Sequence, residues 1–208
     1  MKEITNTLQA IATRLFAEDK IDVFLAWEKG DQDFQTRAYV ARNADDVKNI
    51  VFNEYSIYNV ANVLLKFRDG SERIGIAVKG CDSRGVVRLL EDLQIKRERL
   101  YIVGIPCPGL KDPLAAARNS SGFAKNQEEG LAKKCLDCIQ PNPVIYDELA
   151  GPEQTPRQQG DRFARVKEIE QMSADERYQF WEDTLSACIR CYACRQVCVA
   201  CDCRTCIF

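Results

Sequence analysis

Eleven of the 208 residues are cysteines, and seven of them lie within the last 21 positions. These seven, called here the tail cysteines, are Cys188, Cys191, Cys194, Cys198, Cys201, Cys203 and Cys206. The first four have the spacing C-x2-C-x2-C-x3-C, which bacterial ferredoxins use to bind a [4Fe–4S] cluster. Two-residue gaps let a tight loop present successive thiolates to different irons, and soft thiolates select iron–sulfur clusters or zinc over hard cations. The spacing therefore predicts an iron–sulfur site.

Other uses of clustered cysteines compete with this interpretation. Structural zinc usually takes two C-x2-C pairs separated by about a dozen residues or more, and the unbroken run in the tail fits that pattern poorly. A disulfide framework needs an oxidising compartment, but no apolar signal core follows Met1. Seven unligated thiols in one short segment would be prone to oxidation. An iron–sulfur cluster is favoured, and zinc is the alternative.

The assignment of ligands within the tail stays open. In two-cluster ferredoxins, the fourth cysteine of such a run binds the other cluster. Cys198 could therefore complete a cluster with the three cysteines before it, or it could join the three that follow it. We expect the first three tail cysteines to be ligands in either arrangement.

The remaining four cysteines, called here the core cysteines, are Cys81, Cys107, Cys135 and Cys138. Cys81 and Cys107 each follow an apolar run that is typical of a buried strand, so both should lie at the carboxyl edge of a parallel sheet, where open α/β folds bind ligands. Cys135 and Cys138 form a C-x2-C on a segment that leaves the same edge. We expect a second iron–sulfur site here. The alternatives are zinc and, for the first two, small buried core residues.

Hydrophobic patterning indicates the elements that must position these thiols. Residues 74–78 and 101–105 are continuous apolar runs, and residues 83–93 between them have helical periodicity. Two buried strands joined by a helix indicate a parallel crossover unit. The other expected elements are helices over 4–17, 43–51, 60–67 and 127–134, and a hairpin of strands over 23–27 and 36–40.

The chain divides into three segments on these grounds. Residues 1–125 are predicted to form an α/β domain with a small, layered parallel sheet. Residues 126–160 are predicted to be a loop-rich C-x2-C segment and linker, because prolines and glycines are frequent there. Residues 161–208 are predicted to be a ferredoxin-like tail that contains a helix over 174–187. The side chains expected to pack that helix are Tyr178, Trp181 and Leu185.

The segment that follows the first buried strand could also bind a cofactor. We expect Asp82 or Ser83 to cap a helix that begins at Arg84. The free N–H groups at the start of that helix would suit a phosphate or the negative charge of a cluster. Alternatively, Asp82 only caps and Arg84 is solvated. No G-x-G-x-x-G fingerprint is present, so no dinucleotide site is predicted. The candidate cofactor-binding residues are Lys79, Gly80, Asp82, Ser83 and Arg84.

Composition narrows the possible functions. The net charge of −2 and the pI near 5.4 give no basic footprint for a nucleic acid. Histidine is absent, which removes the commonest general base and any Ser-His or Cys-His dyad. No apolar run approaches the roughly 20 residues that span a bilayer. We therefore predict a cytoplasmic protein of anaerobic metabolism, without a nucleic-acid partner or a membrane span.

Taken together, these motifs resemble those of a known family. Residues 79–84, residues 103–109, the C-x2-C at Cys135 and the tail cysteines are similar to motifs of iron–sulfur proteins related to the beta subunit of coenzyme F-420 hydrogenases and dehydrogenases. Formate dehydrogenase beta-type subunits belong to this group. The resemblance implies one or two [4Fe–4S] clusters and partner subunits of hydrogenase, formate dehydrogenase or heterodisulfide reductase type. It is also the sole basis for expecting a flavin.

The sequence therefore predicts an electron-transfer subunit of an oxidoreductase complex, with clusters that carry the redox chemistry and no catalytic residue of its own. One alternative is a catalytic beta subunit that reacts with a flavin or deazaflavin near residues 79–85. The other is an interaction module in which zinc-bound cysteines are structural. One departure from the usual motif is Val199, since proline often follows the fourth cysteine of such a run.

Overall fold

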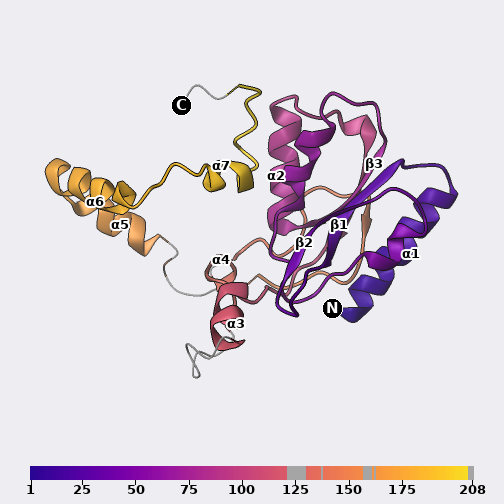
Figure 1. The fold of residues 1–208 in the computed structure, drawn as a ribbon, viewed down its shortest axis with the longest axis horizontal. Helices are drawn as coiled ribbons and strands as arrows, with labels where there is room; N and C mark the ends of the chain where they lie inside the picture. The colour runs from indigo at the N-terminus through magenta and orange to yellow at the C-terminus, as the bar shows by residue number, and fades with distance from the viewer. Residues whose placement is uncertain (121–129, 137, 157–160, 162, 206–208) are drawn as a thin grey trace.

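The computed structural model describes residues 1–120, 130–136, 138–156, 161 and 163–205. Within these residues, a five-stranded sheet has the order β2-β1-β3-β4-β5 (Figure 1). Strands β1, β3, β4 and β5 run parallel to one another, and β2 pairs antiparallel with β1. The α/β class expected from the sequence is confirmed. The strands are β1 (Val23–Lys29), β2 (Thr36–Ala41), β3 (Ile74–Lys79), β4 (Leu100–Ile105) and β5 (Glu148–Leu149).

Helices lie on both faces of this sheet, with α1 on one side and α2 on the other (Figure 1). The helix expected over 4–17 is confirmed as α1, and its Leu8, Ile11 and Leu15 are buried. The α-helices are α1 (Lys2–Ala17), α2 (Gly80–Glu91), α3 (Pro113–Ser120), α4 (Lys133–Leu136), α5 (Ala164–Gln171), α6 (Ala174–Ser186) and α7 (Ala193–Val197). The 3-10 helices are η1 (Asp46–Asn49), η2 (Val60–Phe67) and η3 (Arg97–Arg99).

The centre of the sheet is the predicted crossover unit of β3, α2 and β4. Every residue of β3 is buried, which explains the continuous apolar run in the sequence. The register pairs Ile74 with Leu100 at one end and Lys79 with Ile105 at the other. Since the two strands end opposite each other, the residues that follow them emerge at the same edge of the sheet.

Three predicted elements differ from the structure. The helix expected over 43–51 is a single 3-10 turn, η1, because Ile50 leaves it to bridge Glu28 of β1. Residues 60–67 have the expected bounds but form a 3-10 helix. Helix α2 begins at Gly80, so the prediction that Asp82 or Ser83 caps a helix beginning at Arg84 is wrong. The reason is a capping box in which the Asp82 carboxylate accepts a hydrogen bond from the N–H of Lys79.

The loop-rich segment contributes to the sheet as well. Strand β5 pairs with Val103 and Gly104 of β4. Asp147 fixes this pairing, because its carboxylate accepts the N–H of Ile102 at 2.7 Å and its own N–H donates to the carbonyl of Ile102 at 2.8 Å. The first residues of the helix expected over 127–134 lie outside the described residues, and the described helix there is α4. The division of the chain into three segments stays a prediction.

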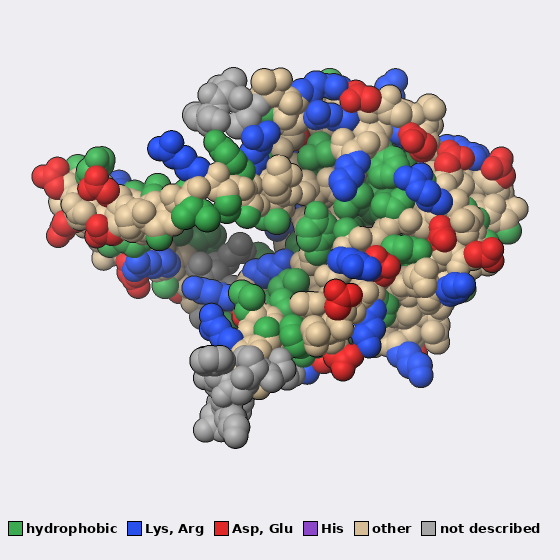
Figure 2. All heavy atoms as spheres, in the orientation of Figure 1, with side chains coloured by type: hydrophobic (Ala, Val, Ile, Leu, Met, Phe, Trp, Pro, Cys, Tyr) green, Lys and Arg blue, Asp and Glu red, His purple; other side chains and the backbone are tan. Residues whose placement is uncertain are grey.

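Helices α5 and α6 form an arm that projects away from the sheet (Figure 1). The side chains expected to pack α6 are exposed instead: Tyr178 by 68%, Trp181 by 47% and Leu185 by 62%. Green hydrophobic side chains are visible on the surface of this arm (Figure 2). The expectation of packing is wrong because α6 contacts α5, through Arg165 stacked on Phe180, rather than the sheet. Among the described helices, none has the length and apolar character that crossing a membrane requires.

Candidate functional site

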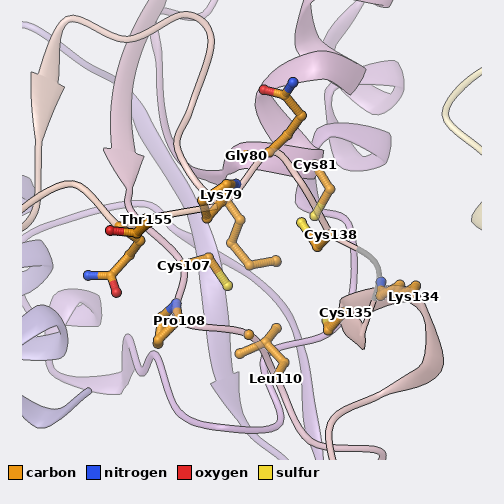
Figure 3. A pocket seen from close by; sticks show the side chains of 14 residues that line it. Lys79, Gly80, Cys81, Cys107, Pro108, Leu110, Lys134, Cys135, Cys138 and Thr155 are labelled. Atoms are coloured by element: carbon orange, nitrogen blue, oxygen red, sulfur yellow. The ribbon is translucent and has the colours of Figure 1, made fainter. Parts of the chain in front are cut away.

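The four core cysteines line one pocket of about 160 Å³ (Figure 3). Cys81 lies in the first turn of α2 and Cys107 follows β4, so the register of β3 with β4 brings them to the same edge. Cys135 lies in α4 and Cys138 follows it. The expectation that these residues converge at the carboxyl edge agrees with this pocket. Their role as ligands stays a prediction.

The segment that carries Cys135 and Cys138 is tied to the chain after β4 at both ends. At one end, the N–H of Ala132 donates to the carbonyl of Leu110 at 2.8 Å. At the other, the N–H of Cys107 donates to the carbonyl of Pro141 at 2.9 Å. The N–H of Cys135 bonds the carbonyl of Ala132 at 2.7 Å, which begins the short helix α4. These backbone bonds place one thiol-bearing segment against the other.

Gly80 and Ser83 hold the start of α2 against the next loop. A Cβ at Gly80 would lie 2.1 Å from the carbonyl oxygen of Gln140, so a residue without a side chain is required there. The Ser83 hydroxyl donates to the carbonyl of Gly80 at 2.9 Å and accepts the N–H of Val144 at 3.0 Å. Both residues were expected to contact a cofactor. The structure shows them fastening the loop that closes the pocket.

Lys79 and Asp82 form a buried ion pair beside the pocket. Their side chains are 1% and 0% exposed, and Nζ lies 2.7 Å from Oδ2. The Lys79 ammonium also donates to the carbonyl of Tyr58 at 3.1 Å and lies 3.9 Å from the centre of the Trp27 ring. Arg84 is exposed. Because the Asp82 carboxylate is bound to Lys79 and the Gln140 carbonyl lies against Gly80, these contacts lend no support to the predicted anion site.

Two of the core thiols have raised pKa values. Desolvation by the surrounding protein, together with the negative charge of the nearby Asp82 carboxylate, raises the pKa of Cys81 to about 11. Burial also raises the pKa of Cys107. Both thiols are therefore protonated at neutral pH in the metal-free protein. A bound metal reverses this preference, because coordination deprotonates a thiol outright.

The donor set of the pocket suits a soft metal group. Four thiols and the apolar side chains of Pro108 and Leu110 surround the space, and thiolates are the ligands of iron–sulfur clusters and of structural zinc. Across the residues that the structure describes, however, no three Cys, Asp or Glu side chains are close enough to hold a metal ion. The thiols surround the pocket without forming a coordination shell, so loading would draw them together.

The described tail cysteines, within 188–205, are all exposed, whereas among the core cysteines only Cys81 is exposed, Cys107 and Cys138 are half-buried and Cys135 is buried. Cys206 lies outside the described residues. Arg190 and Tyr192, one in each two-residue gap, have left-handed backbones with φ of 55° and 58°. This conformation costs roughly 1–2 kcal/mol for residues other than glycine. Such a reversal in each gap bends the chain tightly between successive thiols, as a loop around a cluster requires.

The tail contacts the body beside α2. Val199 is partly buried against the core, and a Cβ at Gly85 would lie 3.2 Å from its Cγ1. Arg68 donates to the carbonyl of Asp202 at 3.0 Å, and Arg204 pairs with Asp69 at 3.0 Å. Gly85 follows Cys81 by one helical turn, a rise of about 6 Å. The tail therefore meets α2 close to the core cysteines, which no sequence pattern indicated.

Comparisons with known proteins give partial similarity. No family model matches the chain. A segment of 135 residues is 22% identical to F420-dependent formate dehydrogenase 1 subunit beta from Methanococcus maripaludis, and this covers 65% of the chain. The match spans 35% of that relative, so the chain corresponds to about a third of its length. A solved chain of the F420-reducing [NiFe] hydrogenase complex from Methanosarcina barkeri is 20% identical, with a TM-score of 0.48, over 61% of this chain and 47% of that one.

Proposed function

We propose that this protein is an iron–sulfur electron-transfer subunit of a cytoplasmic oxidoreductase complex. Its partners would be subunits of hydrogenase, formate dehydrogenase or heterodisulfide reductase type. The tail cysteines bind one [4Fe–4S] cluster in this proposal and the core cysteines bind a second. The chain supplies ligands, burial and nearby charges, while the clusters, when bound, supply the redox chemistry.

The observation that carries the proposal is the gathering of the core cysteines. They come from three separate stretches of sequence, yet all four line one pocket. Buried cysteines scattered by chance through a core would face different neighbours. The ferredoxin spacing of the tail and its docking against α2 add to this support, because they bring a second group of thiols to the same helix. The similarity to a formate dehydrogenase beta subunit points the same way.

The second candidate function is a direct reaction with a flavin or deazaflavin. The similarity to a subunit of an F420-dependent formate dehydrogenase favours it. The size of the pocket argues against the core site as its location. The space is about 160 Å³, whereas sites for larger organic ligands are roughly 300–1,000 Å³. A compact group bound by thiolates fits this space better. The core site is therefore assigned to a cluster in the proposal, and a flavin would need another place.

Metal and sulfide analysis of protein purified without oxygen tests the proposal. We expect about eight irons with matching acid-labile sulfide if both sites are loaded, and about four if only one is. EPR spectra of the reduced protein should show [4Fe–4S] signals. Zinc without sulfide would overturn the proposal in favour of a zinc-stabilised module. Flavin absorbance, with electron exchange to a deazaflavin, would favour the catalytic alternative.

Two variants assign the irons to their sites. Replacing Cys188, Cys191 and Cys194 together by serine should remove the tail cluster and leave the core cluster. Replacing Cys107 and Cys135 by serine should have the opposite result. Loss of all the iron from each variant would show that the two groups of thiols share a single cluster.

A further inference from the structure

The Lys79–Asp82 pair borders the core cysteines and is almost fully buried. Lys79 lines the same pocket as the four thiols (Figure 3). Lysine and aspartate are almost never fully buried unless they are paired, and a buried ion pair is weak evidence for a stabilising role, since apolar residues of similar volume often serve as well. Stability alone therefore does not explain why this ion pair is buried here, whereas a role in the chemistry of the pocket would.

The contacts of the pair fix a charge of each sign in place. The Lys79 ammonium is held by the Asp82 carboxylate, the Tyr58 carbonyl and the face of the Trp27 ring. The other carboxylate oxygen of Asp82, Oδ1, lies 3.7 Å from the sulfur of Cys81. Trp27 belongs to β1 and Asp82 to α2, so the sheet and a helix together hold the pair.

Both charges lie close to the core thiols. Asp82 adjoins Cys81 in the first turn of α2, and Lys79 lines the pocket that all four thiols line. The two members of the pair thus act on negative charge at the thiols with opposite signs. Because both are buried, salt in the solvent screens them only weakly.

We propose that the buried Lys79–Asp82 pair sets the reduction potential of the cluster bound by the core cysteines, with Lys79 favouring the reduced state and Asp82 opposing it. This inference rests on the proposed function. Reduction adds one electron to the cluster and makes it more negative, so a fixed positive charge favours it and a fixed negative charge disfavours it. No bond or proton changes at the pair. Cluster potentials depend on such local charges and on solvent exposure.

The test uses the full chain with Cys188, Cys191 and Cys194 replaced by serine, so that the core cluster gives the signal. Its midpoint potential is measured by EPR during titration with dithionite. We expect Lys79→Met to lower the potential and Asp82→Asn to raise it. Each substitution breaks the same ion pair, so a merely structural role would disturb the cluster in the same direction in both variants. Lys20→Met, which breaks the exposed pair of Lys20 with Glu18, should leave the potential unchanged.

The outcomes separate this inference from the proposed function. Fully loaded variants whose potentials do not move, or move in the same direction, would overturn the inference and leave the proposed function standing. If the tail-substituted chain binds no iron or sulfide, the core site of the proposed function fails, and this inference fails with it. If the Lys79→Met variant does not retain its cluster, the potential of the Asp82→Asn variant alone tests the inference. That variant should keep its fold, because asparagine can still accept the N–H of Lys79. A raised potential then supports the inference, and an unchanged or lowered one overturns it.

Discussion

The core cysteines and the tail cysteines present the same chemical group in two different structural settings. The core cysteines come from positions 81 to 138, and strand register, a missing side chain at Gly80 and backbone hydrogen bonds bring them to one pocket. The described tail cysteines are close in sequence and are exposed. In the part of the chain that the structure describes, the contacts between the tail and the body include Val199, Arg68 and Arg204.

This difference indicates what orders the structure of each site: the fold itself or the group that binds there. The core pocket is shaped by the fold before any metal binds, so its backbone should persist in the metal-free protein. The tail has local spacing and left-handed turns but little burial, so most of its order should come from the group that it binds. In metal sites without a preformed structure, the free energy of binding is also the free energy of folding.

Removing the metal should give the largest contrast between the two regions. In chelated protein, we expect amide hydrogen exchange over residues 188–205 to accelerate by about tenfold or more. Exchange within β3 and β4 should change little, because their pairing does not depend on the thiols. Mass-spectrometric exchange with and without chelator measures this. Equal acceleration in both regions would contradict the distinction drawn above.

Gly80→Ala should break the core site selectively. The added Cβ would meet the carbonyl of Gln140, which is backbone and cannot rotate away, so we expect a loss of about 2–3 kcal/mol in the free energy of unfolding. Gly85→Ala is the matched control in the same helix. Its Cβ would meet neighbours at 3.2 Å or more, and the helical preference of alanine offsets the crowding.

Chemical denaturation of both variants, together with iron analysis, provides the measurement. The Gly80 variant should lose core iron and keep tail iron. A Gly85 variant that is destabilised as strongly would show that the close approach at Gly80 has no special importance.

The reactivity of Cys81 should depend on pH more than that of an ordinary thiol. Its pKa of about 11, against an ordinary value of 9.0, means that less thiolate is present at every pH below 11. At pH 8 the thiolate fraction falls about 100-fold. The more basic thiolate is more nucleophilic, which recovers about tenfold of this loss and leaves alkylation about tenfold slower. Timed iodoacetamide labelling of metal-free protein, read peptide by peptide, tests this.

The same shift has a consequence for stability in the metal-free protein. A thiol whose pKa is raised by folding stabilises the folded state below pH 9, and this contribution is lost as the pH rises towards 11. Labelling of Cys81 at the rate of a free thiol at pH 8 would show that the pocket does not perturb it.

Val199→Asp should have the smallest effect. It places a carboxylate against Gly85 and weakens the docking of the tail by about 1 kcal/mol, while the body keeps its stability. Val197→Asp is the control, because Val197 is 57% exposed. Limited proteolysis of the tail measures the change. Faster cleavage in the Val199 variant alone is expected, whereas equal cleavage in both would rule out Val199 as an anchor.

Much of the core could be predicted from sequence because its signals are local and repeated. Continuous apolar runs identified β3 and β4, and helical periodicity identified α1 and α2. Together they placed Cys81 and Cys107 at one edge. Strand β5 has two residues, too few to show any alternation, and its place depends on the hydrogen bonds of Asp147.

The features that sequence reasoning missed are those that depend on contacts between distant segments. Lys79 is a charged residue at the end of a strand, a position that is usually solvated. Its burial depends on Trp27 and Tyr58, which lie far away in the sequence. The side chains of Tyr178, Trp181 and Leu185 in α6 have the spacing of a packing face, but in the described part of the chain they are exposed and α6 does not pack on the sheet, so periodicity alone overestimated their burial.

The backbone bonds that close the core pocket also imply an order of maturation. The bonds from Ala132 to Leu110 and from Cys107 to Pro141 draw the thiol-bearing segments together as the chain folds. A carrier that delivers assembled clusters would reach the exposed tail of the finished protein more easily than the pocket, where Cys135 is buried and Cys107 and Cys138 are half-buried. We therefore expect that, when clusters are reconstituted into the folded, metal-free chain, the tail cysteines bind a cluster first. The core cysteines should bind theirs later, because the loop beside the pocket must open.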